Sequence, residues 1–377
     1  MKPVTFFLFF VLFISRPADA QEDSQVIRLM REAKLTGLCL GIIENNKPVS
    51  IKAYGFRNKE GRMLNDTGTC FYAASLSKAV FAYLVMQLVD EGKINLDTPL
   101  ANYLPKPLPE FQNYKDLAGD NRWQQITARH CLSHTTGFPN WRYFSPRNNN
   151  KLEIFFQPGS RYAYSGEGIY LLQVAVENIT GKDLETMATE KIFRPLGMTR
   201  TGYIWHQSFE NDYANGYDEK GDSIRKKKRS TANAAGSMET TIADYTRFMA
   251  AVNQGWSLSA KTFHEMLSPQ IYIHSAHQFP SLSTDTSSAN DHIHLSYGLG
   301  WGLFDTPSGT AFFKEGHDDG WVHYSMGIPS TGRALVIMCN SSNGEGVFKE
   351  LVETIAGVVI PWEWEGYIPY NINKNNL

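Results

Sequence analysis

The stretch Tyr72-Ala73-Ala74-Ser75-Leu76-Ser77-Lys78 decides the fold assignment, because it holds a serine hydroxyl three residues before a lysine amine. Apolar residues with helical spacing follow it, so the pair would stand at the start of a helix anchored in a core. Residues i and i+3 share one face of a helix, which brings the Lys78 amine within hydrogen-bond reach of the Ser75 hydroxyl. This arrangement is typical of a nucleophile and its base.

A second Ser-x-x-Lys, Ser223-Ile224-Arg225-Lys226, shows how little the spacing means by itself. It lies in a polar stretch that ends in a run of basic residues, and no apolar helix pattern follows it. We therefore interpret residues 225–229 as a solvated loop and Ser75 as the candidate nucleophile.

The composition predicts a globular protein with no nucleic-acid partner. The 377 residues, 42% hydrophobic and 13% aromatic, are enough to bury a large core. Thirty-six basic residues against 38 acidic ones leave a formal charge of -2, which gives no indication of a surface for nucleic acids or anionic membranes. The ten histidines form no ligand-spaced cluster beyond His130 and His134, so we expect neither a metal nor another cofactor.

The first twenty residues match a secretory signal: Lys2, an apolar run over residues 4–14, and Ala18-Asp19-Ala20 before Gln21. The apolar run is too short for a stable membrane span, and no later segment is long and apolar enough. We expect residues 1–20 to be removed and the mature protein to be periplasmic or secreted.

An oxidising compartment would permit disulfides among the four cysteines, Cys39, Cys70, Cys131 and Cys339. Cys39 and Cys339 lie in strand-like apolar runs, where a buried free thiol is the commoner state. The sequence leaves the pairing open.

Both ends of the chain are rich in strand-like segments, whereas the middle has a mostly helical pattern. The patterns predict a helix over residues 24–33, strands over 38–44, 48–54, 311–313, 322–328 and 333–339, and a closing helix over 346–359. We therefore predict an α+β fold in which both chain ends form one antiparallel sheet flanked by helices. The α/β part would comprise residues 21–74 and 290–360, the inserted helical part 75–289, and a tail 361–377.

Two further segments carry reactive side chains. Tyr164 precedes an apolar helix pattern, so it lies on a loop and can face a cleft; a ring that packs with only its hydroxyl exposed is the alternative. Lys314 lies in a strand-like segment beside Gly316, whose missing side chain lets a substrate approach closely. An exposed edge lysine next to a turn is the alternative there.

Together and in this order, the three segments resemble the serine β-lactamase and penicillin-binding protein superfamily, in particular its class C β-lactamase-like branch. Accessory segments resemble that branch along nearly all of the mature chain: residues 126–138 (ITARHCLSHTTGF), Pro195-Leu196-Gly197-Met198, Ala235-Gly236-Ser237-Met238 followed by Asp244, and Tyr297-Gly298-Leu299-Gly300-Trp301. Counting back from Gly320-Trp321 identifies Lys314-Glu315-Gly316 as the equivalent of the family's Lys-Thr-Gly motif. The resemblance implies the β-lactamase/transpeptidase-like fold.

The resemblance also implies a serine hydrolase that acts on a small ester, amide or peptide. Ser75 would attack the carbonyl and form an acyl-enzyme. Either Lys78 or Tyr164 would be the first base, and Lys314 would favour the phenolate form of Tyr164. Backbone amides of Ser75 and His317 would hold the oxyanion, beside Gly316.

The histidines receive different interpretations. His130 and His134 belong to the accessory block at residues 126–138 and are interpreted as packing or capping residues. His317 and His323 follow Lys314 closely and are candidates for substrate contact.

Two departures from the family pattern bear on specificity. Gly166 stands where an asparagine usually binds a substrate amide, and Glu315 stands where a threonine helps to hold a substrate carboxylate. If the Glu315 side chain faces the cleft, a substrate carboxylate would meet a like charge. Both changes favour an esterase or a peptidase, such as a carboxylesterase, D-aminopeptidase or DD-peptidase, over a dedicated β-lactamase.

Two alternatives remain at this point. The first is a β-lactamase or DD-peptidase acting on β-lactams or peptidoglycan peptides. The second, from another class, is a sensor that binds penicillin or peptidoglycan fragments without turnover. The presence of all the reactive side chains, Ser75, Lys78, Tyr164 and Lys314, argues against the sensor.

Overall fold

The structure is a computed structural model that describes residues 17–372. The expected signal segment 1–20 lies mostly outside the described residues, as do residues 373–377 of the expected tail. Helix α1 (Pro17–Glu32) begins earlier than the predicted helix over residues 24–33. It runs through the expected cleavage point without a break.

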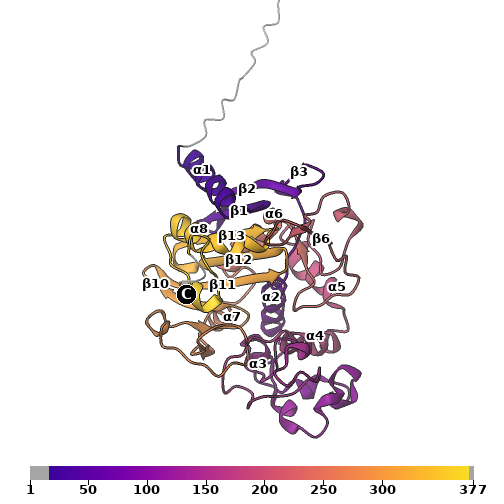
Figure 1. Ribbon diagram of the computed structural model, residues 1–377. Coiled ribbons are helices and arrows are strands. Elements are labelled where there is room, and N and C mark those ends of the chain that lie inside the picture. The colour runs from indigo at the N-terminus through magenta and orange to yellow at the C-terminus, as the bar shows by residue number, and fades with distance from the viewer. Residues whose placement is uncertain (1–16, 373–377) are drawn as a thin grey trace, which may run out of the picture.

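A nine-stranded antiparallel sheet in the order β3-β2-β1-β13-β12-β11-β10-β9-β8 forms the frame of the molecule (Figure 1). Strand β1 pairs with β13, with Leu38 opposite Cys339, so the predicted joining of the two chain ends in one sheet is confirmed. The strands of this sheet are β1 (Gly37–Glu44), β2 (Lys47–Asn58), β3 (Met63–Leu64), β8 (Ile271–Tyr272), β9 (Ser296–Tyr297), β10 (Gly302–Thr306), β11 (Gly309–Asp318), β12 (Trp321–Ile328) and β13 (Arg333–Cys339).

Two small ladders lie outside the large sheet. β4 (Phe71–Tyr72) pairs with β7 (Glu239–Thr240), and β5 (Gly216–Tyr217) pairs with β6 (Ser223–Ile224). The first of these ladders leads directly into the Ser75 segment.

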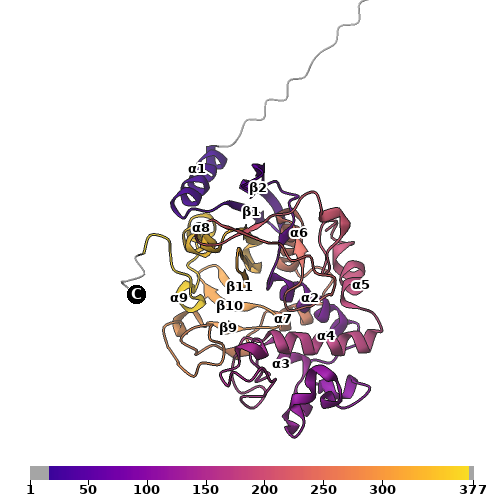
Figure 2. The same cartoon turned by 45° about the vertical axis from the view of Figure 1, so that its right-hand side comes forward.

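Helices lie on both faces of the sheet (Figures 1 and 2). The remaining α-helices are α2 (Leu76–Asp90), α3 (Ala128–Leu132), α4 (Gly166–Thr180), α5 (Leu184–Ala188), α6 (Ile242–Asn253), α7 (Ala260–Met266), α8 (Phe348–Ala356) and α9 (Trp362–Glu365). Short 3-10 helices at Leu108–Glu110, Gln112–Leu117 and Asn121–Gln125 lie between α2 and α3. Helices are the main regular elements over residues 75–289, where the strands are only two residues long and irregular segments connect them.

Alternation along β13 divides the core into two parts. Ala334, Val336 and Met338 pack in one cluster with residues of α2 and α6, whereas the residues between them pack in a second cluster with α1, α8 and α9. Successive side chains of a strand point to opposite faces of a sheet, which accounts for this division. Both faces of the central strands are therefore covered, and the two ends of the chain share the second cluster.

The α2 helix is buried on all its faces, with every residue from Leu76 to Leu88 inside the protein. A helix that is apolar all round has no preferred solvent face and is stable only in the interior. Hence α2 forms a fixed axis in the helical region, with Ser75 at its first turn.

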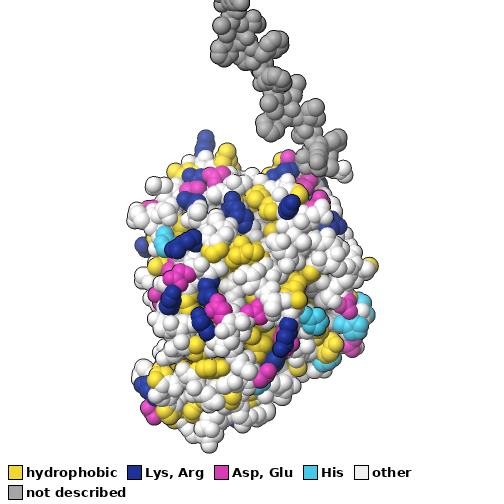
Figure 3. Space-filling view, turned by 180° about the vertical axis from the view of Figure 1, so that it is seen from behind, with side chains coloured by type: hydrophobic (Ala, Val, Ile, Leu, Met, Phe, Trp, Pro, Cys, Tyr) yellow, Lys and Arg dark blue, Asp and Glu magenta, His cyan; other side chains and the backbone are white. Residues whose placement is uncertain are grey.

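Charged side chains of both signs are interspersed on the face in Figure 3, in keeping with the nearly balanced charge. Among residues 17–372, no helix combines the length and the apolar character needed to cross a bilayer. All four cysteines are buried and unpaired.

Candidate active site

The Ser75 segment is held by the small ladder that precedes α2. The backbone amide of Ala73 donates to the Met238 carbonyl at 2.8 Å, next to the pairing of β4 with β7. Ala74 then takes a left-handed conformation with a φ of 46°, which is unfavourable for a residue with a Cβ atom. From Thr69 to Leu88, Ser75 alone is not buried, so this turn exposes a single hydroxyl at the surface of the core.

Lys78 lies behind Ser75, as the i, i+3 spacing predicted. Its Nζ is 2.8 Å from Ser75 Oγ and donates to the carbonyl of Ala235 at 2.5 Å. Burial, followed by the positive charge of Lys314, holds the pKa of Lys78 well below that of an ordinary lysine. A buried amine with a lowered pKa can be neutral and accept a proton from the hydroxyl beside it.

Tyr164 reaches the same point from the loop before α4. Lys314 Nζ donates to the Tyr164 hydroxyl at 3.0 Å, and Lys78 Nζ lies 5.0 Å from the centre of the Tyr164 ring. The structure therefore brings together Ser75, Lys78, Tyr164 and Lys314, which lie far apart in the sequence.

The protonation state of Tyr164 is opposite to the one expected from Lys314 alone. Burial raises the pKa of Tyr164 well above its ordinary value, and the charge of Glu315 adds to the rise. The hydrogen bond with Ser75 acts in the other direction but does not prevail. The raised pKa favours the phenol form of Tyr164 at neutral pH.

Lys314 lies in β11 directly after the residue at which the pairing of β11 with β10 ends. The β10–β11 pairing ends at Gly302 opposite Phe313, so among the described strands β11 continues past this point with β12 alone. Phe312 packs toward the α2 side and Phe313 toward the opposite side, so alternation directs Lys314 toward α2 and Ser75. The open edge lies beside Lys314, Glu315 and the residues after them.

Glu315 turns to its neighbour rather than presenting a free carboxylate to the cleft. Its side chain is buried, its Oε1 lies 2.7 Å from Lys314 Nζ, and Gln278 Nε2 donates to the same oxygen at 2.8 Å. Burial opposes ionisation, but the charge of Lys314 and these hydrogen bonds lower the pKa of Glu315 below its usual range. The carboxylate thus stays charged, and it neutralises Lys314 inside the protein.

Gly166 opens α4 against an aromatic side chain. An added Cβ at Gly166 would lie 2.8 Å from Cζ2 of Trp141, too close for any ordinary contact. The indole thus occupies the room that a side chain at this position would need. The missing family asparagine is replaced by the edge of a ring, not by open space.

The histidines fall into three groups. His130 takes part in a capping box at the start of α3, and His134 packs its ring 4.3 Å from that of Tyr164. His317 is 59% exposed at its side chain and pairs with Glu345, which raises its pKa. His323 is fully buried and donates from Nε2 to the Tyr72 carbonyl at 2.7 Å, so its expected substrate contact is wrong.

The basic run at residues 225–229 is an irregular loop with Arg225, Lys227 and Lys228 exposed, as the sequence suggested, but Lys226 and Arg229 are anchored. Lys226 is buried, and its Nζ lies 2.6 Å from a carboxylate oxygen of Glu239, which is buried as well. The guanidinium carbon of Arg229 lies 3.8 Å from the centre of the Tyr72 ring. The run therefore fastens a loop to the ladder that carries Ser75.

Three contributors to the site were not identified from the sequence. Ala235 supplies a carbonyl to Lys78, and its segment was noticed only as a resemblance. Gln278 comes from a loop without a motif, and Trp141 follows the accessory block at residues 126–138 by three residues. Only the chain's folding brings them to the four reactive side chains.

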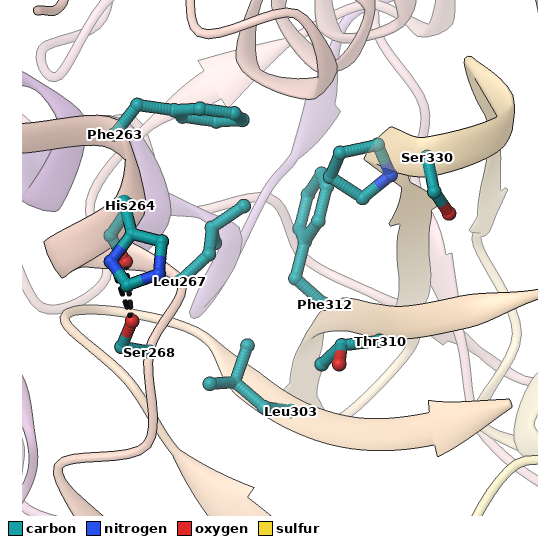
Figure 4. A pocket seen from close by; sticks show the side chains of 9 residues that line it. Phe263, His264, Leu267, Ser268, Leu303, Thr310, Phe312 and Ser330 are labelled. Atoms are coloured by element: carbon teal, nitrogen blue, oxygen red, sulfur yellow. Dashed lines mark hydrogen bonds between the residues drawn. The ribbon is translucent and has the colours of Figure 1, made fainter. Parts of the chain in front are cut away.

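A cavity of about 310 Å³ elsewhere in the molecule is separate from this site (Figure 4). Its walls come from α7, β10, β11 and the segment after β12: Phe263, His264, Leu267, Ser268, Leu303, Thr310, Phe312, Pro329 and Ser330. The Ser268 hydroxyl donates to the His264 carbonyl at 2.6 Å and also lies 3.3 Å from Nδ1 of the same histidine. Within residues 17–372, no group of three or more His, Cys, Asp or Glu side chains is arranged to hold a metal ion.

Comparison with known proteins gives matches along most of the chain. A family model described as Beta-lactamase matches residues 23–359. The chain is 23% identical over 364 residues to the Beta-lactamase of Pseudomonas fluorescens, covering 90% of this chain and 91% of that protein. It is 26% identical over 258 residues to PbpX of Bacillus subtilis (strain 168), covering 66% of this chain. The chain spans 62% of PbpX and 43% of Protein flp of Staphylococcus aureus (strain MRSA252), less than two thirds of each.

Solved structures match in fold. A Beta-Lactamase/D-Alanine Carboxypeptidase from Pseudomonas syringae superposes with a TM-score of 0.72 at 19% identity, covering 92% of this chain and all of that one (100%). The D-alanine Carboxypeptidase AmpC from Burkholderia cenocepacia gives a TM-score of 0.70 at 21% identity, covering 90% and 99%. At such identities the likeness concerns the arrangement of the backbone.

Proposed function

Because this chain belongs to the Beta-lactamase family, we propose that it is a serine hydrolase that cleaves an ester or amide bond through an acyl-enzyme on Ser75. The single observation that carries the proposal is the contact of 2.8 Å between Lys78 Nζ and the Ser75 hydroxyl in a buried setting. A nucleophile beside a base with a lowered pKa is the arrangement that acyl transfer needs.

In the first half-reaction, Ser75 Oγ forms a bond to the substrate carbonyl carbon while its proton passes to Lys78 Nζ. We assign the first base to Lys78 rather than Tyr164, because the pKa of Lys78 is lowered and that of Tyr164 is raised. The tetrahedral intermediate then breaks the bond to the leaving group. Tyr164, still a phenol, donates the proton that the departing alcohol or amine requires.

The oxyanion would lie between the backbone amides of Ser75 and His317. The β11–β12 hairpin closes with Asp318 opposite Trp321 across a two-residue turn. When Asp318 and Trp321 exchange backbone hydrogen bonds, the backbone amide of the next residue inward, His317, points away from β12 and toward the open edge of the sheet. Each such donor is worth about 3 kcal/mol in the transition state. Water then attacks the acyl carbon and gives a proton to the Tyr164 phenolate, and as the second tetrahedral intermediate breaks its bond to Ser75 Oγ, Lys78 returns its proton to that oxygen.

The ion pair between Lys314 and Glu315 supports a substrate without a carboxylate at this place. An isolated lysine would attract a substrate carboxylate. The ammonium group of Lys314 lies 2.7 Å from the carboxylate of Glu315, so the pair has no net charge that could attract one. This favours an esterase- or peptidase-like enzyme that acts on neutral substrates over a dedicated β-lactamase. For the export of the protein, the signal-like segment at residues 1–20 is the supporting observation.

The test combines ester turnover with intact-mass analysis of acylation. With p-nitrophenyl acetate, Ser75→Ala should lower kcat/KM by about 10⁴-fold or more. Ser223→Ala, in the second Ser-x-x-Lys, is the matched control and should behave as the wild type. Turnover that survives in Ser75→Ala would refute the proposal.

Mixing the protein with benzylpenicillin separates the alternatives. A short-lived adduct on Ser75 with steady drug loss would indicate a β-lactamase, and a long-lived adduct with ester turnover a penicillin-binding hydrolase. Labelling of one equivalent without turnover of any substrate would indicate a sensor. We expect slow acylation or none, because Glu315 neutralises Lys314.

A further inference from the structure

Three aromatic side chains on the loop before α4 form a surface that the reaction proposed above does not use. We call Trp141, Tyr143 and Phe144 the aromatic shelf. The rings of Trp141 and Tyr143 are stacked, with centres 6.2 Å apart and planes 8° from parallel, and Phe144 packs edge-on against Tyr143 at 4.6 Å. Tyr143 is 57% exposed and Phe144 is 65% exposed. Contiguous exposed aromatic rings are typical of a binding surface.

The shelf begins beside the reactive side chains. Trp141 fills the space next to Gly166, two residues after Tyr164. Backbone amides of Gly166 and Glu167 donate to the carbonyl of Asn140 at 2.9 and 3.0 Å, so the loop is bonded to the same turn that carries Tyr164. The indole therefore holds a fixed position relative to the Tyr164 hydroxyl.

The far end of the shelf approaches β11. Burial is the main cause of the raised pKa of Tyr143, and the negative charge of Asp318, the last residue of β11, is the second cause. The phenol therefore lies within electrostatic reach of that end of the strand. Burial raises the pKa of Tyr72, which lies three residues before Ser75, and Tyr143 makes a smaller electrostatic contribution to the same rise. The geometry thus attaches the shelf through Trp141 to the turn that carries Tyr164, and its exposed rings continue from there along the loop.

The shelf is held rigidly before any ligand binds. Arg142, in the middle of the loop, donates from Nε and its backbone amide to Glu167 Oε1 at 2.9 and 3.0 Å, and from a terminal nitrogen to Oε2 at 2.9 Å. Glu167 is almost fully buried at the start of α4. A rigid loop avoids the entropic cost of ordering on binding, which favours recognition of a small molecule.

We propose that the aromatic shelf is the acyl-group subsite of this enzyme and that it selects substrates whose acyl group carries a flat apolar ring. The inference rests on the proposed function and names its substrate class. A ring in that subsite would pack against Phe144 and against Trp141, whose indole stands where the side chain of the family's asparagine would lie. The polar handle of that asparagine is replaced by an apolar surface, so the preference changes from amide-bearing to aryl-bearing acyl groups.

The experiment compares p-nitrophenyl phenylacetate with p-nitrophenyl acetate, which share a leaving group and differ in the ring. In the wild type we expect kcat/KM to favour phenylacetate by about tenfold or more. Trp141→Ala should reduce this ratio by about tenfold, mainly through KM, and Trp141→Phe should restore most of it. Tyr272→Ala, which removes a ring on β8 that is 51% exposed, should leave the ratio at the wild-type value.

The outcomes separate the two proposals. Ser75-dependent turnover of both esters with equal kcat/KM, or a ratio that Trp141→Ala does not change, would overturn the subsite and leave the hydrolase. No Ser75-dependent turnover of either ester would overturn the hydrolase and the subsite with it. Circular dichroism and thermal unfolding of each variant show whether a change in the ratio comes from loss of the fold.

A shelf used for self-association would give another result. Light scattering would then detect concentration-dependent dimers in the wild type that Phe144→Ala abolishes, and the ester ratio would be unaffected by that variant. This outcome too would overturn the subsite. We expect Phe144→Ala to lower the ester ratio and to leave the molecular mass unchanged.

Discussion

The surroundings of Lys78 lower the pKa of its amine. The side chain is only 2% exposed, and a second cation, Lys314, acts on it across the Tyr164 ring. Both effects disfavour the ammonium form, and Glu315 opposes them only in part. In the proposed mechanism Lys78 can act as the base because the first turn of α2 lies inside the core.

This predicts the pH dependence of the reaction. A base acts only when deprotonated, so kcat/KM should rise with pH as Lys78 loses its proton, at a pH well below the pKa of an ordinary lysine. The phenol of Tyr164 keeps its proton to high pH, so a broad plateau should follow. The pH profile of p-nitrophenyl acetate hydrolysis between pH 5 and 10 measures both limbs.

Lys78→Arg is the informative variant, because a guanidinium cannot be deprotonated in this range. It should have no plateau at any pH, even though it keeps a donor near Ser75. An activity rise that begins only above pH 10, or full activity in Lys78→Arg, would contradict the role of Lys78 as base.

At this scale the sequence could predict only what is local. Ser75 and Lys78 meet because they are one helical turn apart, and this contact follows from spacing. The direction of Glu315 could not be predicted, because its partner Gln278 comes from a distant loop without a motif. The burial of Lys226 was missed for a similar reason, since its partner Glu239 belongs to another strand.

At the scale of the elements, His323 connects three strands that fix the position of the Ser75 turn. It belongs to β12, donates from Nε2 to the carbonyl of Tyr72 in β4, and accepts at Nδ1 from the amide of Cys339 in β13. The ring must be neutral to accept and donate in this way. One imidazole therefore fixes the position of the short ladder against the large sheet.

His323 should make the fold sensitive to acid. Burial lowers its pKa from 6.5 to about 4 in the folded protein. Because this folded-state pKa lies below the unfolded one, the unfolded chain binds more protons between these pH values. Stability from this group is complete above pH 6.5 and falls as the pH decreases toward 4. The loss should be about 1.4 kcal/mol per pH unit and about 3 kcal/mol in all.

Urea unfolding at pH 7 and pH 4.5 measures this loss. His323→Gln should be less stable than the wild type at pH 7 and should show a smaller difference between the two pH values. Other groups also titrate in this range, so the comparison of the two proteins isolates the imidazole. Equal differences in both would exclude His323 as the acid-sensitive contact.

Most of the strands of the sheet followed from the sequence, whereas the ends of several elements did not. Strands β12 and β13 match the predicted residues 322–328 and 333–339 within one residue, because β13 is a continuous apolar run after Arg333 and β12 is rich in apolar and aromatic residues. β11 extends to Asp318, well past the predicted end at residue 313, because its polar residues pair with β12. Pairing with a neighbour, which a single segment does not reveal, sets that end.

For the molecule as a whole, the C-terminal segment is part of the structure that supports the site. Trp364 of α9 is 1% exposed, in the same cluster as Phe313 of β11. Its carbonyl accepts the backbone amide of Gln278 at 2.8 Å, and the Gln278 side chain holds Glu315. A contact chain thus leads from the end of the chain to Lys314.

Trp364→Ala should therefore affect both stability and activity. Loss of a fully buried tryptophan costs about 3–5 kcal/mol, and the folded fraction should show a lower kcat/KM because Gln278 is less well held. Val359→Ala, which shortens a side chain that is 62% exposed just before α9, is the control and should change neither. Thermal unfolding and ester kinetics at low temperature measure the two effects. A Trp364→Ala protein with wild-type stability would refute the importance of this segment.

The pairing of β1 with β13 has a consequence for the time at which the protein becomes active. Gly37 and Cys339 are in contact although 302 positions separate them, and contacts of such long range form late because a long loop must close first. His323, which anchors the Ser75 turn, also comes from the last part of the chain. A ribosome-bound chain that ends before β11 therefore has Ser75 and Lys78 but lacks the sheet edge and Lys314. We expect such a nascent chain to be inactive, so that the proposed hydrolysis would begin only after β11, β12 and β13 have been synthesised.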